Sequence, residues 1–108
     1  GLAIATALNR LNQNTSLYLR LLEVFQRNQS STAEKMQELL AEENLVDAAR
    51  LAHTLKGIAG SLGAKGLETA SRTAEAQLRE GNVVPDSLAT LEKDLKQVLK
   101  AVADLLAR

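Results

Sequence analysis

Residues 44–63 read NLVDAARLAHTLKGIAGSLG, and the pattern of this stretch indicates the fold class. Its apolar residues recur at helical spacing and form an inner face. That face consists of Ala48, Leu51, Ala52, Leu55, Ala59 and Leu62. Asn44 is a suitable N-cap with Asp47 in the first turn, and Gly63 is a suitable residue to end the helix. We therefore predict a helix over this stretch, with His53 pointing away from the inner face.

The surroundings of His53, the only histidine, keep one side of this helix open. Gly57 and Gly60 follow it by four and seven residues and Ala49 precedes it by four, so all share one helical face. A glycine in a helix interior costs about 1 kcal/mol relative to alanine, which indicates that access to His53 matters here. Lys56, three residues on, places a cation beside the ring. We predict an exposed imidazole that takes up a negatively charged group from a flat partner surface.

The rest of the chain repeats the helical pattern outward from this stretch. Apolar stripes with a spacing of three or four residues occupy residues 4–11, 17–25, 33–40, 67–78 and 88–105. Ser31 and Glu34 match a capping box, and Pro85 fits the first turn of the last helix. The sequence therefore predicts an all-α fold, an antiparallel up-down four-helix bundle with a short extra N-terminal helix over residues 4–11. A coiled coil along the last stripe is a weaker alternative, because that stripe runs under three heptads.

Length and composition narrow the functional classes. The 108 residues predict one domain over 1–108. Lys and Arg number 13 and Asp and Glu number 13, which argues against nucleic-acid binding because such proteins carry a basic surplus or stripe. There is no cysteine and the single histidine has no partner ligands, so we predict no metal site. No apolar run approaches the ~18 residues needed to span a bilayer, so we expect no direct membrane contact and a cytoplasmic location.

The segment that begins at His53 resembles the signature of histidine-containing phosphotransfer (HPt) domains of the bacterial hybrid sensor kinase type. The family pattern is His-x-x-Lys-Gly-x-x-x-x-x-Gly, and His53, Lys56, Gly57 and Gly63 meet its fixed positions. Residues 16–25 also look like the family's stretch before its first bundle helices. The likeness therefore covers nearly the whole chain.

The resemblance implies a function in a phosphorelay. His53 would accept a phosphoryl group from an aspartate on the receiver domain of a hybrid kinase and pass it to the aspartate of a second receiver, a response regulator. Lys56 would neutralise the phosphoryl oxygens, and Gly57 would leave room for the receiver to dock. Glu75 occupies the place on the neighbouring helix where family members often carry Gln or Glu near the histidine, and Arg79 matches a position that is basic in some members, which makes both candidate second-layer residues of the site. Their spacing is equally that of an ordinary i,i+4 ion pair, and this alternative stays open.

The same resemblance sets expectations about cofactors and context. The chain has no P-loop and no glycine-rich strand-to-helix turn for ATP, so we expect a phosphoryl carrier without kinase activity. No cofactor is expected, and Mg²⁺ would come with the receiver. A monomer is expected, as the C-terminal module of a larger hybrid sensor kinase, in the cytoplasmic part of an inner-membrane sensor. Two alternatives are an adaptor bundle with a degenerate acceptor site and an autonomous enzyme, which would need a catalytic constellation that the sequence lacks.

Overall fold

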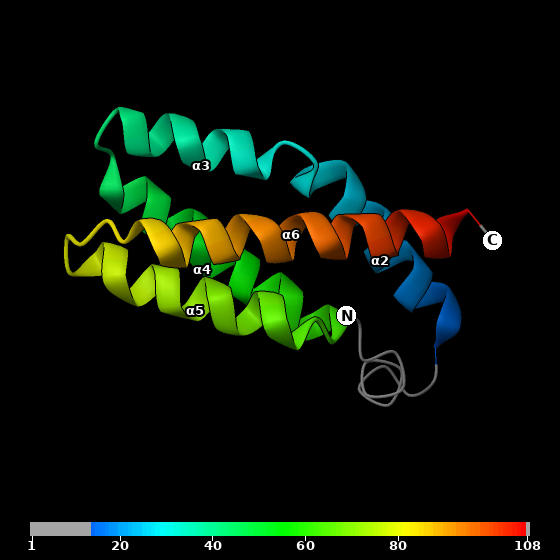
Figure 1. Ribbon diagram of the computed structural model, residues 1–108. Helices are drawn as coiled ribbons and strands as arrows, with labels where there is room; N and C mark the ends of the chain where they lie inside the picture. The colour runs from blue at the N-terminus through cyan, green and yellow to red at the C-terminus, as the bar shows by residue number, and fades with distance from the viewer. Residues whose placement is uncertain (1–13, 108) are drawn as a thin grey trace.

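The structure, a computed structural model, describes residues 14–107 and consists of helices joined by short links (Figure 1). The helices are α2 (Thr15–Gln29), α3 (Thr32–Ala41), α4 (Leu45–Leu62), α5 (Lys65–Arg79) and α6 (Pro85–Leu106). Helices α3 to α6 form the bundle, and α2 is an N-terminal helix that bends away from the direction of α3. The predicted all-α bundle is confirmed. The short helix predicted over residues 4–11 lies outside the described residues.

The core lies where the inner faces of these helices meet. Helix α4 packs against α5, α3 and α2, and α6 packs against α5 and α2. Fully buried side chains come from every helix except α3; the largest are Phe25, Leu22, Leu55, Leu62, Leu67, Leu95 and Val102. Burying one such side chain contributes about 1.5–3 kcal/mol, so this apolar seam holds α4 and α5 in a fixed relation to each other.

The two ends of α4 are fixed as its sequence predicts. The Asn44 side chain accepts a hydrogen bond from the backbone N–H of Asp47 at 3.2 Å. Gly63 has a φ of 78°, in the left-handed region that favours glycine. The backbone N–H of Ala64 then returns to the carbonyl oxygen of Ala59 at 2.9 Å. This tight reversal starts α5 directly beside α4.

The link between α2 and α3 differs from the predicted capping box. Ser31 is the N-cap of α3, but its side chain makes no capping hydrogen bond. Its ψ of 11° is far from the extended conformation that points a capping side chain at the helix amides. The hydroxyl of Thr32 instead donates to the buried side chain of Gln29. The capping-box prediction involving Glu34 was therefore wrong in its side-chain contact, although the start of the helix was correct.

A long-range polar contact fixes α2 against α4. The Tyr18 hydroxyl donates to the carbonyl oxygen of Leu62 at 3.2 Å, and both residues are buried. The Leu62 carbonyl belongs to the last turn of α4, where carbonyl groups lack partners within the helix. Burial also raises the pKa of Tyr18.

Candidate functional site

His53 lies in the middle of α4 and points to solvent. Its side chain is 58% exposed, whereas its neighbours Ala52 and Leu55 are buried in the core. The residue therefore takes the outward position that the apolar pattern of α4 leaves for it. An exposed ring of this kind can meet another protein without any opening of the bundle.

One edge of the ring faces a buried carboxylate on α5. The Nδ1 atom of His53 lies 2.9 Å from Oε2 of Glu75, and the Glu75 side chain is only 8% exposed. Glu75 is thus buried between α4 and α5, and it contacts only one side of the His53 ring. The opposite ring nitrogen, Nε2, is on the side of the ring away from this contact.

Two permanent cations hold the same carboxylate. Lys56 Nζ lies 2.9 Å from Glu75 Oε1, and its side chain is 28% exposed. Arg79 donates to Glu75 Oε2 from both Nη2, at 2.7 Å, and Nε, at 2.9 Å. Glu75 is therefore the centre of a network that joins α4 to α5. The i,i+4 ion pair with Arg79 exists, and it belongs to the same network as His53 rather than standing apart from it.

The network keeps Glu75 ionised. Burial alone would raise the pKa of Glu75, but the hydrogen bonds from Lys56, Arg79 and His53, together with the charge of His53, outweigh burial and lower it to about 2. An ionised carboxylate can only accept hydrogen bonds. In the contact with Glu75, the Nδ1 atom of His53 must consequently carry the proton. In the neutral ring, Nε2 then carries the lone pair.

The glycines and the alanine that were predicted to open this face have different surroundings. A Cβ atom on Gly57 would meet nothing within 4 Å, so the surface beside His53 is open there. A Cβ atom on Gly60 would lie 2.7 Å from Oε2 of Glu68, so Gly60 lies beneath a side chain of α5. Ala49 is only 3% exposed and belongs to the core. The expectation that Ala49 and Gly60 continue the open face was therefore wrong.

The cause is the twist of the helix. Four residues advance about 400° around an α-helix, so each step of four rotates a side chain by about 40°. Going back from His53 to Ala49 rotates the side chain towards the interior of the bundle, while going forward to Gly57 rotates it towards solvent. Only Gly57 is placed as the access prediction requires.

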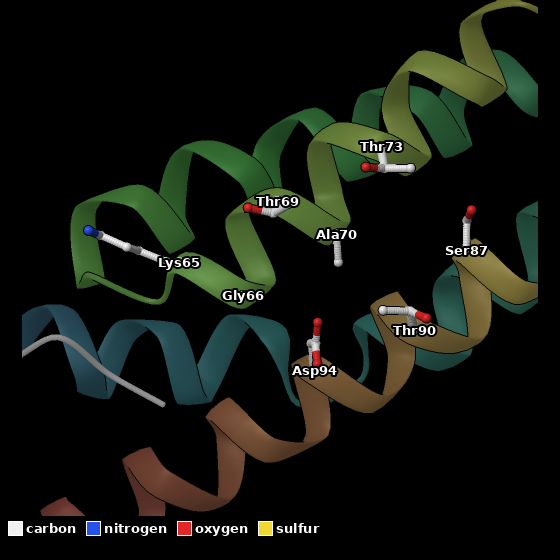
Figure 2. A pocket seen from close by; sticks show the side chains of 8 residues that line it. All are labelled: Lys65, Gly66, Thr69, Ala70, Thr73, Ser87, Thr90 and Asp94. Atoms are coloured by element: carbon white, nitrogen blue, oxygen red, sulfur yellow. The ribbon is translucent and has the colours of Figure 1, made fainter.

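The molecule also has a groove, which lies away from His53. It lies between α5 and α6, has a volume of about 530 Å³ and is lined by Lys65, Gly66, Thr69, Ala70, Thr73, Ser87, Thr90 and Asp94 (Figure 2). None of the network around His53 lines it. Sites for small molecules are usually concave, whereas His53 lies on the exposed side of a helix. This placement suits a macromolecular partner.

Two further properties apply to the described part of the chain. Among residues 14–107, no group of three or more His, Cys, Asp or Glu side chains is placed to hold a metal ion. Within the same range, no helix is both long and apolar enough to cross a membrane.

Comparison with known proteins gives the family. The family model for the Hpt domain matches residues 20–105, most of the chain, and the chain therefore belongs to the Hpt domain family. The chain is also similar to the crystal structure of the HPT domain of a sensor hybrid histidine kinase from Shewanella, with a TM-score of 0.87 and 23% identity. That match covers 98% of this chain and 93% of the Shewanella chain. No curated protein matches the sequence.

Family membership defines the class of function. The chain is a histidine phosphotransfer domain of a two-component phosphorelay, and receiver domains are its class of partner. Such domains carry phosphoryl groups without kinase activity of their own. The prediction from the resemblance is confirmed at this level.

Proposed function

We propose that His53 is the phosphoacceptor and that its Nε2 atom is the nucleophile. The observation that carries this proposal is the 2.9 Å contact between His53 Nδ1 and the ionised, buried Glu75. The contact requires the proton on Nδ1, which leaves a lone pair on Nε2. The fixed carboxylate also holds the ring in one orientation, as a partner group does in other histidine nucleophiles.

The transfer step follows from this tautomer. The Nε2 lone pair attacks phosphorus of the aspartyl phosphate, a P–N bond forms, and the bond between phosphorus and the aspartyl oxygen breaks. The aspartate leaves as a carboxylate, and the ring of His53 acquires a positive charge because Nδ1 keeps its proton. Glu75 lies where it can stabilise that charge. Passing the group to a second receiver reverses the step, and the ring returns to the neutral form. Such transfers depend mainly on positioning and charge neutralisation.

Lys56 has a place in this scheme that the sequence alone did not suggest. Its ammonium group contacts Glu75 Oε1 and so helps to hold the carboxylate that orients His53. Its predicted contact with the phosphoryl oxygens remains part of the proposal. We expect the domain to need no cofactor, with Mg²⁺ supplied together with the receiver. In support, both oxygens of Glu75, the carboxylate nearest His53, are already occupied by nitrogen donors.

The receivers are proposed to dock on the outer face of α4. Val46, Arg50, His53 and Gly57 lie within about 60° of one another around the helix axis, given 100° per residue. Val46 is 70% exposed, the most exposed of the large apolar residues described, and Arg50 has a side-chain exposure of 74%. An apolar contact beside a cation fits a partner with an apolar patch and an acidic rim. We propose that its partners are the receiver domain of a hybrid kinase and the receiver domain of a response regulator. We also propose that this domain is monomeric and forms the C-terminal module of such a kinase in the cytoplasm.

The test is phosphoryl transfer from a panel of phosphorylated receiver domains to the wild type and to His53→Gln. We expect rapid loss of label from at least one receiver, with acid-labile label on the wild type and none on the variant. Ser61→Ala, an exposed hydroxyl on the same helix, is the matched control and should accept the group normally. Label on His53→Gln would refute His53 as the acceptor. A folded wild type that accepts from no receiver would favour the adaptor alternative.

A further inference from the structure

One oxygen of Glu75 is shared between two side chains. Oε2 receives Nη2 of Arg79 at 2.7 Å, Nε of Arg79 at 2.9 Å and Nδ1 of His53 at 2.9 Å. A carboxylate has about four lone-pair sites over its two oxygens, so three donors exceed the capacity of one oxygen. Lys56 occupies the other oxygen. Arg79 and His53 therefore compete for the same acceptor.

We propose that Arg79 is a positioning residue that limits how strongly Glu75 stabilises phosphorylated His53, and thereby keeps the phosphoryl group easy to pass on. This inference rests on the proposed function of His53. It deepens that proposal by assigning one residue to the balance between acceptance and release.

The direction of the effect follows from the charges. Phosphorylation at Nε2 leaves a positive ring, which the Glu75 carboxylate stabilises. The guanidinium of Arg79 is always charged and donates two hydrogen bonds in a fixed fork. It withdraws part of the Oε2 acceptor capacity from Nδ1 and places a like charge near the ring. Both effects raise the free energy of phosphorylated His53 relative to the unphosphorylated form.

Three charged or titratable side chains contact Glu75 in the described part of the chain. The ion pairs of Glu75 within residues 14–107 involve His53 and Lys56 on α4 and Arg79 on α5. Lys56 uses Oε1 and so does not compete directly for Oε2. The side chain of Arg79 is 59% exposed, so solvent and salt reduce its long-range effect. The effect of Arg79 should therefore depend chiefly on its two hydrogen bonds.

Two roles for Arg79 predict opposite results. If Arg79 shares Oε2 with His53, its removal strengthens the contact between Glu75 and the ring. If Arg79 merely anchors Glu75, its removal lets the carboxylate move away and weakens that contact. In the first case, Arg79→Met stabilises phosphorylated His53, whereas Glu75→Gln destabilises it. In the second case, both substitutions destabilise phosphorylated His53.

The experiment measures the equilibrium of the phosphoryl group between this domain and one receiver, for the wild type, Arg79→Met and Glu75→Gln. We expect Arg79→Met to shift the equilibrium about three- to tenfold towards phosphorylated His53, the change that corresponds to one hydrogen bond of ordinary net strength, because the exposure of Arg79 weakens the effect of its charge. Glu75→Gln should shift it the other way. Arg72→Met is the matched control, because Arg72 is an exposed arginine on α5 with an i,i+4 partner in Glu68 at 3.9 Å, and it should leave the equilibrium unchanged.

A second readout needs no phosphorylation. The ¹⁵N shifts of the His53 ring, measured at alkaline pH, report the fraction of the tautomer with the proton on Nδ1. Because the contact with Glu75 already places the proton on Nδ1, Arg79→Met should leave this fraction equal or higher, whereas Glu75→Gln should lower it. A lowered fraction in Arg79→Met, or an equilibrium that shifts as in Glu75→Gln, would overturn the inference. Failure of the wild type to accept any phosphoryl group would instead count against the proposed function, and the ring shifts would still decide the role of Arg79.

Discussion

The buried carboxylate of Glu75 makes the stability of this domain dependent on pH in a way that Glu75→Gln should abolish. The pKa of Glu75 in the folded protein is about 2, against an ordinary value of 4.5. A pKa difference of one unit corresponds to about 1.36 kcal/mol. The difference between the folded and unfolded pKa of Glu75 therefore contributes about 3 kcal/mol to the unfolding free energy. Because the folded value is the lower one, the contribution is complete above the unfolded value, near pH 5 and higher. It is lost as the pH falls towards 2.

The measurement is urea unfolding followed by circular dichroism at a series of pH values between 7 and 3. The glutamine variant keeps the shape of the side chain but has no carboxylate to protonate. The difference in unfolding free energy between the wild type and Glu75→Gln should therefore shrink on acidification, by about 2 kcal/mol at pH 3 from the linkage relation. The buried position of Glu75, with an exposure of 8%, makes solvent screening a small correction.

A matched surface pair supplies the control. Glu92 and Lys96 form an i,i+4 ion pair at 3.0 Å on α6, with side-chain exposures of 36% and 67%. Pairs of this type contribute only about 0.3–0.5 kcal/mol, so the difference between the wild type and Glu92→Gln should change little with pH. If Glu75→Gln and Glu92→Gln gave the same pH dependence, the reasoning that Glu75 is the buried centre of a cationic network would be refuted.

Two other substitutions test access and the anchoring of α2. Gly57→Ala should raise the unfolding free energy by up to about 1 kcal/mol, because the new Cβ atom would meet nothing within 4 Å. Gly57→Leu should slow phosphoryl transfer from a receiver while leaving the fold intact. An unchanged transfer rate in Gly57→Leu would contradict the proposal that Gly57 leaves room for the receiver. Tyr18→Phe should lower the unfolding free energy by about 1 kcal/mol in urea titrations, because the Leu62 carbonyl loses its donor, and a variant as stable as the wild type would show that this hydrogen bond adds nothing.

Much of the fold could be predicted from local signals in the sequence. The bounds of α4 follow from Asn44 and Gly63 at its two ends and from the apolar spacing between them, and all of these signals are local in the sequence. The exposure of His53 follows from the same spacing. The contact of Ser31 was mispredicted because its backbone conformation depends on how α2 meets α3, and the residue types alone do not show that geometry.

The place of Glu75 is harder to predict, because it depends on how two helices pair. His53 stands 10 residues before Gly63 and Glu75 stands 11 residues after Ala64, so an antiparallel pair with a tight turn brings them opposite each other. Gly60 and Glu68, three and four residues from the same turn, meet for the same reason. The sequence holds this signal, but it becomes usable only once the turn is known to be short. The three nitrogen donors on Oε2 could not be predicted at all, because they depend on side-chain rotamers.

The two glycines of α4 have different physical reasons to be glycine. Gly60 allows α5 to approach, because the Glu68 side chain occupies the place of a Cβ atom. A Cβ atom on Gly57 would meet nothing within 4 Å, so the packing of the folded chain does not explain why this residue is not alanine. A residue that lowers helix stability without any gain in packing has its reason outside the domain. Since Gly57 lies one turn from His53 on the open side, we propose that this reason is the surface of a receiver that docks beside His53.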